Sequence, residues 1–139
     1  MKASKKKRKT LLITLLIAIL IFASNFFISN KIEVKQTLII NQNIDDVWEI
    51  MGNQYAEVDI WSSNFFESEP GGDPEFDGLN FSNRITITER GKTIQELDAF
   101  DPIHHSFSYH ITEGKPSIAS EAKSTWTLSE TESNRTEVN

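Results

Sequence analysis

Cysteine is absent from this sequence of 139 residues, and its absence excludes several classes of protein and site. No disulfide framework can form, no thiol nucleophile or thiolate-bound zinc is available, and no lipoprotein-type cysteine can carry a lipid. The sequence also lacks internal repeats, coiled-coil heptads and low-complexity tracts. Any chemistry must therefore come from other residue types.

Basic residues are scarce outside the first nine positions. The chain has 14 Lys and Arg against 20 Asp and Glu, and six of the basic residues lie within residues 1–9. Residues 31–139 therefore keep 8 basic and 20 acidic side chains, a formal charge of −12. This part has no basic stripe to neutralise phosphates, so nucleic acid is not an expected partner. Its length suits a single domain with one modest core.

A long apolar run follows the basic cluster. Thr10 to Ile28 reads TLLITLLIAILIFASNFFI, 19 residues of which four are polar. As a helix this run would be about 28 Å long, close to the roughly 30 Å hydrocarbon thickness of a bilayer. We predict a transmembrane helix or signal anchor over residues 10–29. Residues 1–9 are then a cytoplasmic flank, because basic residues next to a transmembrane segment favour the cytoplasmic side. The domain of residues 30–139 is then extracytoplasmic.

A cleaved secretory signal is the alternative for the same segment. Cleavage needs small residues at positions −3 and −1, but the available pairs place Ile21 before Ala23 or Phe22 before Ser24. The apolar run also continues past these positions. An uncleaved anchor is therefore favoured over a secreted domain, and either reading exports residues 30–139.

In residues 30–139, the pattern of apolar and turn residues predicts one strand, two short helical pieces and then several strands. Strict alternation of apolar and polar residues predicts a half-buried strand over residues 30–41. Apolar residues at helical spacing between Asn43 and Gly52 predict a capped amphipathic helix, and a second short helical or irregular piece is expected over Tyr55–Trp61. Turn residues then separate five predicted strands and the start of a sixth near residue 135: 64–68, 79–89, 93–100, 106–112 and 121–129. This order predicts an α+β protein with an antiparallel sheet.

Each longer strand offers one apolar face that is rich in aromatic residues. A curved sheet with such a face either packs solidly or encloses a cavity. The alternation predicts these shared faces: Leu79, Phe81, Ile85 and Ile87; Ile94, Glu96 and Phe100; Phe107, Tyr109 and Ile111; and Ala122, Ser124, Trp126 and Leu128.

Several short pieces, in this order and spacing, carry a family resemblance. They are Ile44-Asp45-Asp46-Val47-Trp48-Glu49-Ile50, Trp61, Gly78 with Arg84, Ile94-Gln95-Glu96-Leu97-Asp98, Asp101, Phe107-Ser108-Tyr109, Ser124-Thr125-Trp126 and Arg135-Thr136-Glu137-Val138. The chain resembles the START-like (SRPBCC) superfamily of polyketide cyclases/dehydrases and lipid-transfer proteins over residues 32–139.

This resemblance implies a helix-grip fold, in which a curved antiparallel sheet and a long C-terminal helix enclose an elongated apolar pocket. No counterpart of the gripping helix occurs before Asn139, so residues 30–139 are expected to be an incomplete START-like ligand-binding domain. Asn43 stands where the family commonly has proline, and both residues can start a helix.

The expected ligand-binding residues combine the aromatic faces with two charged groups: Phe81, Arg84, Glu96, Phe107, Tyr109 and Trp126. The resemblance implies that Glu96 faces the pocket, where its pKa could be raised. A rim carboxylate in water or a partner of Arg84 is the alternative for Glu96. The resemblance implies that Arg84 anchors the ligand. The alternation of the predicted strand instead places Arg84 on the solvent-exposed face. Tyr109 and Trp126 line a site or simply pack in the core.

No metal ion or other cofactor is expected. His104, His105 and His110 lack the spacing of a metal site, and the acidic stretch of residues 73–78 has Arg84 where a calcium loop requires glutamate. Hydrolase triads and phosphate-binding loops are also missing.

The leading hypothesis is a membrane-anchored extracytoplasmic domain that binds a lipid or other hydrophobic small molecule in a concave apolar pocket. The first alternative is a polyketide cyclase/dehydratase-like enzyme that uses Glu96 and Tyr109 in the same pocket. The second is a pocketless protein-interaction module, which requires Phe81, Tyr109 and Trp126 to be packed solidly.

Overall fold

The computed structural model describes residues 32–132 and 134–139. The predicted basic flank of residues 1–9 and the predicted span of residues 10–29 lie outside these residues, so both stay predictions. Among the residues described, no helix is long and apolar enough to cross a bilayer. The unit formed by Lys35–Asn139 is described below.

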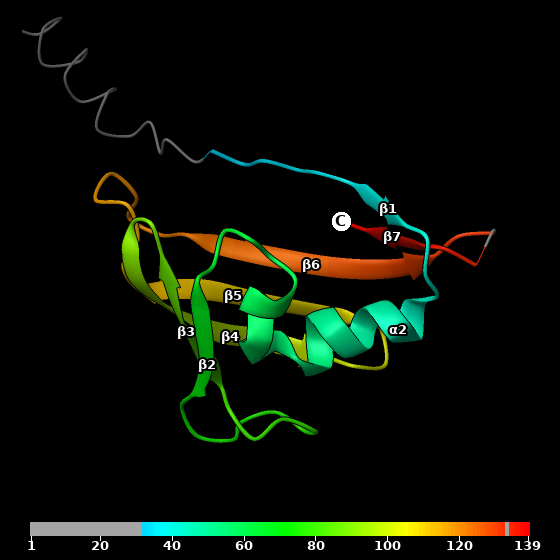
Figure 1. The fold of residues 1–139 in the computed structure, drawn as a ribbon, viewed down its shortest axis with the longest axis horizontal. Coiled ribbons are helices and arrows are strands. Elements are labelled where there is room, and N and C mark those ends of the chain that lie inside the picture. The colour runs from blue at the N-terminus through cyan, green and yellow to red at the C-terminus, as the bar shows by residue number, and fades with distance from the viewer. Residues whose placement is uncertain (1–31, 133) are drawn as a thin grey trace, which may run out of the picture. The chain divides into compact units, whose positions relative to one another are not determined.

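A curved antiparallel sheet of seven strands frames this unit (Figure 1). Strands β2 to β7 are neighbours in chain order, and β1 pairs with the free edge of β7. The strands are β1 (Leu38–Ile40), β2 (Glu67–Gly71), β3 (Asn83–Thr88), β4 (Gly91–Asp101), β5 (Ser106–Glu113), β6 (Lys123–Glu130) and β7 (Thr136–Val138). The predicted α+β class with an antiparallel sheet is confirmed.

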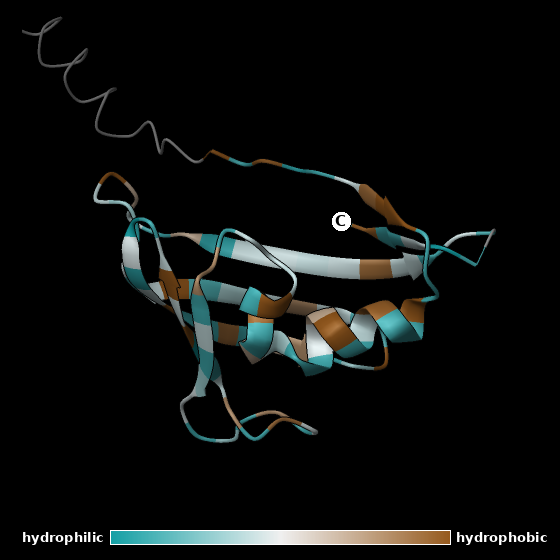
Figure 2. Cartoon of the chain, viewed as in Figure 1, coloured by the Kyte–Doolittle hydropathy of each residue, from teal (hydrophilic) through white to brown (hydrophobic). Residues whose placement is uncertain are grey.

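The two predicted short helical pieces connect β1 to β2. The first is α2 (Ile44–Trp48), which continues as the π-helical turn η1 (Glu49–Asn53), and the second is the 3₁₀ helix η2 (Tyr55–Ile60). The Asn43 side chain accepts a hydrogen bond from the Asp46 backbone N–H at 2.9 Å, so Asn43 caps α2 as expected. Figure 2 shows apolar and polar residues alternating around this segment.

The core lies between the helical segment and one face of the sheet. The helical segment contributes Val47, Trp48, Met51 and Tyr55. Strands β4 to β7 contribute Leu97, Phe107, Leu128 and Val138, and Leu79 and Phe81 come from the β2–β3 connection. The buried apolar residues therefore gather on the face of the sheet that the helical segment covers.

The first two strands differ from the prediction in their bounds. The strand predicted over residues 30–41 is limited to Leu38–Ile40, because its only pairing partner among the described residues, β7, is itself three residues long. The strand predicted over residues 64–68 begins at Glu67 and runs to Gly71, since its hydrogen bonds to β3 extend over Pro70. Proline is tolerated there because β2 is an edge strand.

The predicted face of β3 is wrong. Phe81 and Ser82 are adjacent and both buried, so the alternation of the sequence is broken before the strand begins at Asn83. Beyond this break Arg84 and Thr86 face the core, whereas Ile85 and Ile87 face the other side of the sheet. The inner face of β3 is therefore polar rather than aliphatic.

Candidate functional site

An aromatic cluster occupies the inner face of the sheet, with Phe107 of β5 at its centre. The centroid of the Phe107 ring lies 5.5 Å from that of Tyr55, 6.2 Å from those of Trp48 and Trp126, and 6.5 Å from that of Tyr109. These partners come from α2, η2, β5 and β6. The cluster therefore joins the helical segment to the middle of the sheet.

Burial is uneven across this cluster. Phe107 is 3% exposed, and Tyr55 is fully buried. Phe100, Tyr109 and Trp126 are only half-buried, although they pack against the same core. One part of the cluster is thus sealed, and the part contributed by β4, β5 and β6 keeps aromatic surface in contact with solvent.

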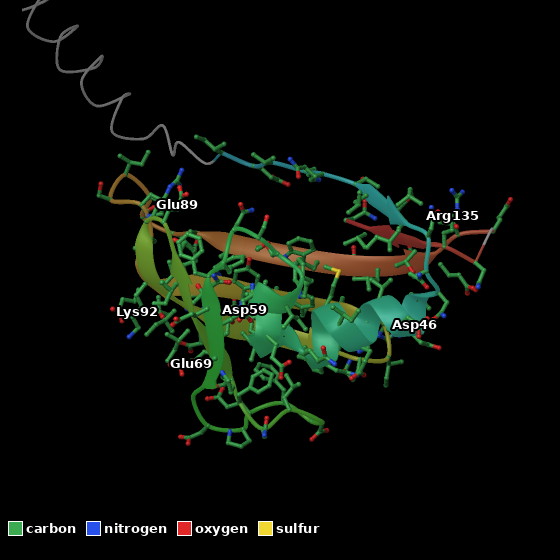
Figure 3. The ribbon with its side chains drawn as sticks, viewed as in Figure 1. Asp46, Asp59, Glu69, Glu89, Lys92 and Arg135 are labelled. Carbon is green, nitrogen blue, oxygen red and sulfur yellow. The ribbon has the colours of Figure 1, made fainter. Side chains whose placement is uncertain are left out.

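Arg84 lies at the Tyr55 end of the cluster and is 4% exposed. Its guanidinium carbon is 4.1 Å from the Tyr55 ring centroid, 5.1 Å from that of Tyr109 and 5.8 Å from that of Phe65. Aromatic faces attract cations, and the attraction is stronger where water is excluded. The exposed side chains of Asp46 and Arg135, labelled in Figure 3, lie instead at the periphery of the unit.

Neutral acceptors hold the Arg84 guanidinium. Its Nε and Nη2 both donate to Gln95 Oε1, at 2.9 and 2.7 Å, and its Nη1 donates to the backbone carbonyl of Tyr55 at 2.8 Å. No aspartate or glutamate in residues 32–132 and 134–139 forms an ion pair with it. The positive charge of Arg84 is therefore buried and, among the described residues, contacted by neutral groups rather than by a paired carboxylate.

Gln95 of β4 anchors this arrangement from the other side. Its Nε2 donates to the hydroxyls of Thr93 and Thr86, at 3.2 and 3.4 Å, and these two hydroxyls bond each other at 2.7 Å. Both Gln95 and Thr86 are buried. Because the amide oxygen of Gln95 is held in this way, it presents one fixed acceptor to Arg84.

Tyr55 connects the polar network to the aromatic cluster. Its hydroxyl donates to the backbone carbonyl of Gln95 at 3.1 Å. Burial raises the pKa of Tyr55 above its ordinary value, and the positive charge of Arg84 offsets part of that increase. The phenol is therefore a neutral donor at physiological pH.

Two indole groups of the cluster lack hydrogen-bond acceptors among the described residues. They are the Nε1 atoms of Trp48 and Trp126, both of which are buried. A buried N–H without an acceptor costs free energy, and such groups are rare in native proteins. Two buried donors of the cluster thus remain unpaired among the described residues.

The structure brings together five of the six predicted site residues. Phe81 and Phe107 are buried in the core, Tyr109 and Trp126 are half-buried, and Arg84 is buried next to Tyr109.

The face predicted for Glu96 is wrong, since its side chain is exposed and pairs across the outer surface with His110 in the strand register. Thr93, Gln95 and Leu97 share the inner face in unbroken alternation, and the register shift between Leu97 and Ala99 returns Phe100 to that face, so that Phe100 and Glu96 face opposite ways. Gln95 was therefore missed, and no signal in the sequence marks the bulge.

The three histidines lie apart from the cluster's polar network, each beside a different aspartate. His104 Nδ1 is 2.7 Å from Asp101 in the β4–β5 turn, and His110 Nδ1 is 2.8 Å from Asp98 on the outer face. His105 Nε2 is 3.6 Å from Asp45 of α2. The His104 and His110 pairs are turn and surface contacts, whereas the His105 ring also packs edge-on against Trp48 of the aromatic cluster, with ring centroids 5.4 Å apart.

Comparisons with known proteins agree with this architecture. The family model described as polyketide cyclase / dehydrase and lipid transport matches residues 31–139. The solved structure of the protein XoxI from Bacillus cereus superposes with a TM-score of 0.60 at 22% identity, covering 74% of this chain and 68% of that one. An uncharacterized protein from Bacillus thuringiensis superposes with a TM-score of 0.59 at 22% identity, covering 74% and 70%. No curated protein matches the sequence.

Proposed function

The chain belongs to the polyketide cyclase/dehydrase and lipid transport family, and from this premise we propose that its domain binds a hydrophobic small molecule, such as a lipid, against the half-buried aromatic face of the sheet. The observation that carries this proposal is the partial exposure of Phe100, Tyr109 and Trp126 beside the sealed core. Aromatic surface of this kind gains free energy when an apolar ligand removes it from water.

The same observation argues against a solidly packed interaction module. Such a module requires Phe81, Tyr109 and Trp126 to be fully enclosed, and of these three only Phe81 is buried. An enzymatic role that depends on Glu96 receives no support from its exposed position. Binding is therefore proposed ahead of catalysis.

Tryptophan NMR tests the binding proposal, because the chain has three tryptophans in distinct settings. The full-length chain, labelled with ¹⁵N-tryptophan and held in lipid nanodiscs, is titrated with the neutral apolar probe 1-decanol. The indole signal of Trp126 should shift, and that of Trp61, which lies outside the aromatic cluster and is 40% exposed, should not. Equal shifts at Trp126 and Trp61 would contradict binding at this face.

Two variants of neighbouring residues on β5 supply a matched comparison. Tyr109→Ala removes a half-buried ring from the inner face and should weaken the response of Trp126 to 1-decanol. His110→Ala changes the next residue, which lies on the opposite face beside Asp98, and should leave the response unchanged. An equal loss in both variants would indicate a general effect on folding rather than a binding face.

We further propose that residues 10–29 anchor the domain outside the cytoplasm. The support is the apolar run with its basic flank, and the absence of cysteine makes the topology easy to test. Ile118→Cys places a single thiol at a position in the β5–β6 connection that is 95% exposed, and Lys2→Cys places one on the basic flank. A membrane-impermeant maleimide should label only the Ile118→Cys chain in intact cells, and the labelled chain should stay with the membranes. Labelling of Ile118→Cys only after lysis would contradict export, and release into the medium would indicate signal cleavage.

A further inference from the structure

The buried charge of Arg84 has no negative partner within the described residues, and this determines what a ligand must supply. Moving an ion out of water is unfavourable unless an opposite charge or sufficient hydrogen bonds compensate it. Gln95 and the Tyr55 carbonyl are both neutral, and no carboxylate among the described residues forms an ion pair with Arg84. A negative group from outside the chain would complete the site.

Arg84 also retains unused donors. A guanidinium has five N–H groups. Three of them donate within the described residues, two to Gln95 and one to Tyr55. Among the described residues, the terminal nitrogens Nη1 and Nη2 therefore each keep one N–H without an acceptor. Two oxygens of one carboxylate match such a pair of donors, because both groups are planar and can form parallel hydrogen bonds.

The two unpartnered indole N–H groups favour an acceptor-rich ligand as well. The ring centroids of Trp48 and Trp126 each lie 6.2 Å from that of Phe107. Their buried N–H donors therefore belong to the aromatic cluster that Arg84 adjoins. A cluster in which only donors lack partners selects for ligands that bring acceptors. The side chains of Phe65 and Tyr109, which flank the guanidinium, are half-buried and leave an approach to it.

We propose that the ligand is an amphipathic carboxylic acid whose carboxylate accepts hydrogen bonds from Arg84 while its apolar body lies against Tyr109 and Trp126. This inference rests on the proposed function, since it specifies the chemistry of the molecule bound at the same face. Arg84 provides the preference for a carboxylate, and the aromatic rings provide the affinity for the apolar body. The two contributions can therefore be measured separately.

The test compares two ligands that differ only in the head group, decanoate and 1-decanol, at neutral pH. The full-length chain in nanodiscs is titrated with each, the free concentrations are measured, and the indole signal of Trp126 reports saturation. Charge-assisted hydrogen bonds should give decanoate an affinity about tenfold or more above that of 1-decanol. Equal affinities would overturn this inference and leave the proposed function standing. Saturable binding of neither compound would overturn the proposed function and this inference with it.

Gln95→Glu has nearly the same side-chain shape and should remove the preference for decanoate. Its carboxylate would take the place of Gln95 Oε1, which already bonds Arg84 at 2.7 Å, and would neutralise the guanidinium from within. The ratio of the decanoate affinity to the 1-decanol affinity should fall to about one. Arg90→Gln, in the exposed β3–β4 turn, should keep the full preference. A preference for decanoate that persists in Gln95→Glu would overturn the assignment of Arg84.

Discussion

The backbone carbonyl of Tyr55 accepts a hydrogen bond from Nη1 of Arg84 at 2.8 Å, while the ring of the same tyrosine lies 4.1 Å from the guanidinium carbon. One residue of η2 thus binds one residue of β3 through both its main chain and its side chain. The Tyr55 hydroxyl also reaches the Gln95 carbonyl of β4 at 3.1 Å. This pair therefore fixes the helical segment on the sheet and shapes the polar end of the aromatic cluster.

Replacement of Tyr55 by phenylalanine should lower the free energy of unfolding by about 1–2 kcal/mol, because the ring is kept while one buried hydrogen bond is lost. Urea denaturation of the full-length chain measures the change. Tyr109→Phe is the matched control, since among the described residues no hydrogen bond of the Tyr109 hydroxyl is found. Equal losses in the two variants would show that the bond to Gln95 contributes nothing specific.

Thr86→Val should lower the free energy of unfolding by about 1–3 kcal/mol, because valine has nearly the shape of threonine but cannot bond the groups around it. Thr86 is fully buried. Its hydroxyl forms hydrogen bonds with the Thr93 hydroxyl and with the side-chain amide of Gln95. Thr125→Val, on the exposed face of β6, should change the stability by less than about 0.5 kcal/mol. A mild effect at Thr86 would mean that the polar network does not contribute to stability.

Gly52→Ala should destabilise the fold by about 1–3 kcal/mol, because a β-carbon at this buried position overpacks the core. It would lie 2.5 Å from Cε2 of the Trp48 ring. Thermal or urea unfolding measures the loss. In a Trp48→Leu background the same substitution should cost less, and an identical cost in both backgrounds would rule out the clash as its cause.

Acid should remove the contribution that Asp101 in the β4–β5 turn makes to the stability of the fold. The hydrogen bond with the His104 side chain, together with backbone N–H groups of His104 and Ile103, holds the pKa of Asp101 below its ordinary value. A carboxyl whose pKa is lowered by folding stabilises the fold above the unfolded pKa, and this contribution is lost as the pH falls through the folded pKa. The stability advantage of the natural chain over Asp101→Asn should therefore be present at neutral pH and decline below about pH 4. A difference that does not vary with pH would contradict this account.

The order and type of the elements followed from local patterns. Asn43 before an apolar 3.6-residue period predicts a capped helix, and period-two alternation bounded by turn residues predicts β4, β5 and β6, all of which are confirmed. These signals depend on neighbouring residues only, so the sequence contains them directly. The residues that carry the family resemblance likewise led to the family that the comparison supports.

The sequence by itself determined the class of the protein: a strongly acidic α+β domain with one aromatic sheet face, behind a predicted membrane anchor. Only the tertiary structure decided which polar residues belong to the inner face. The adjacent buried pair Phe81 and Ser82 reverses the direction of the side chains that follow in β3, and the register shift between Leu97 and Ala99 puts Phe100 on the face opposite to Glu96. A single displaced residue turns an alternating strand over, so Arg84 and Gln95 face the core and Glu96 faces water. The buried guanidinium that defines the candidate site arises from strand register, which depends on pairing between distant segments of the chain.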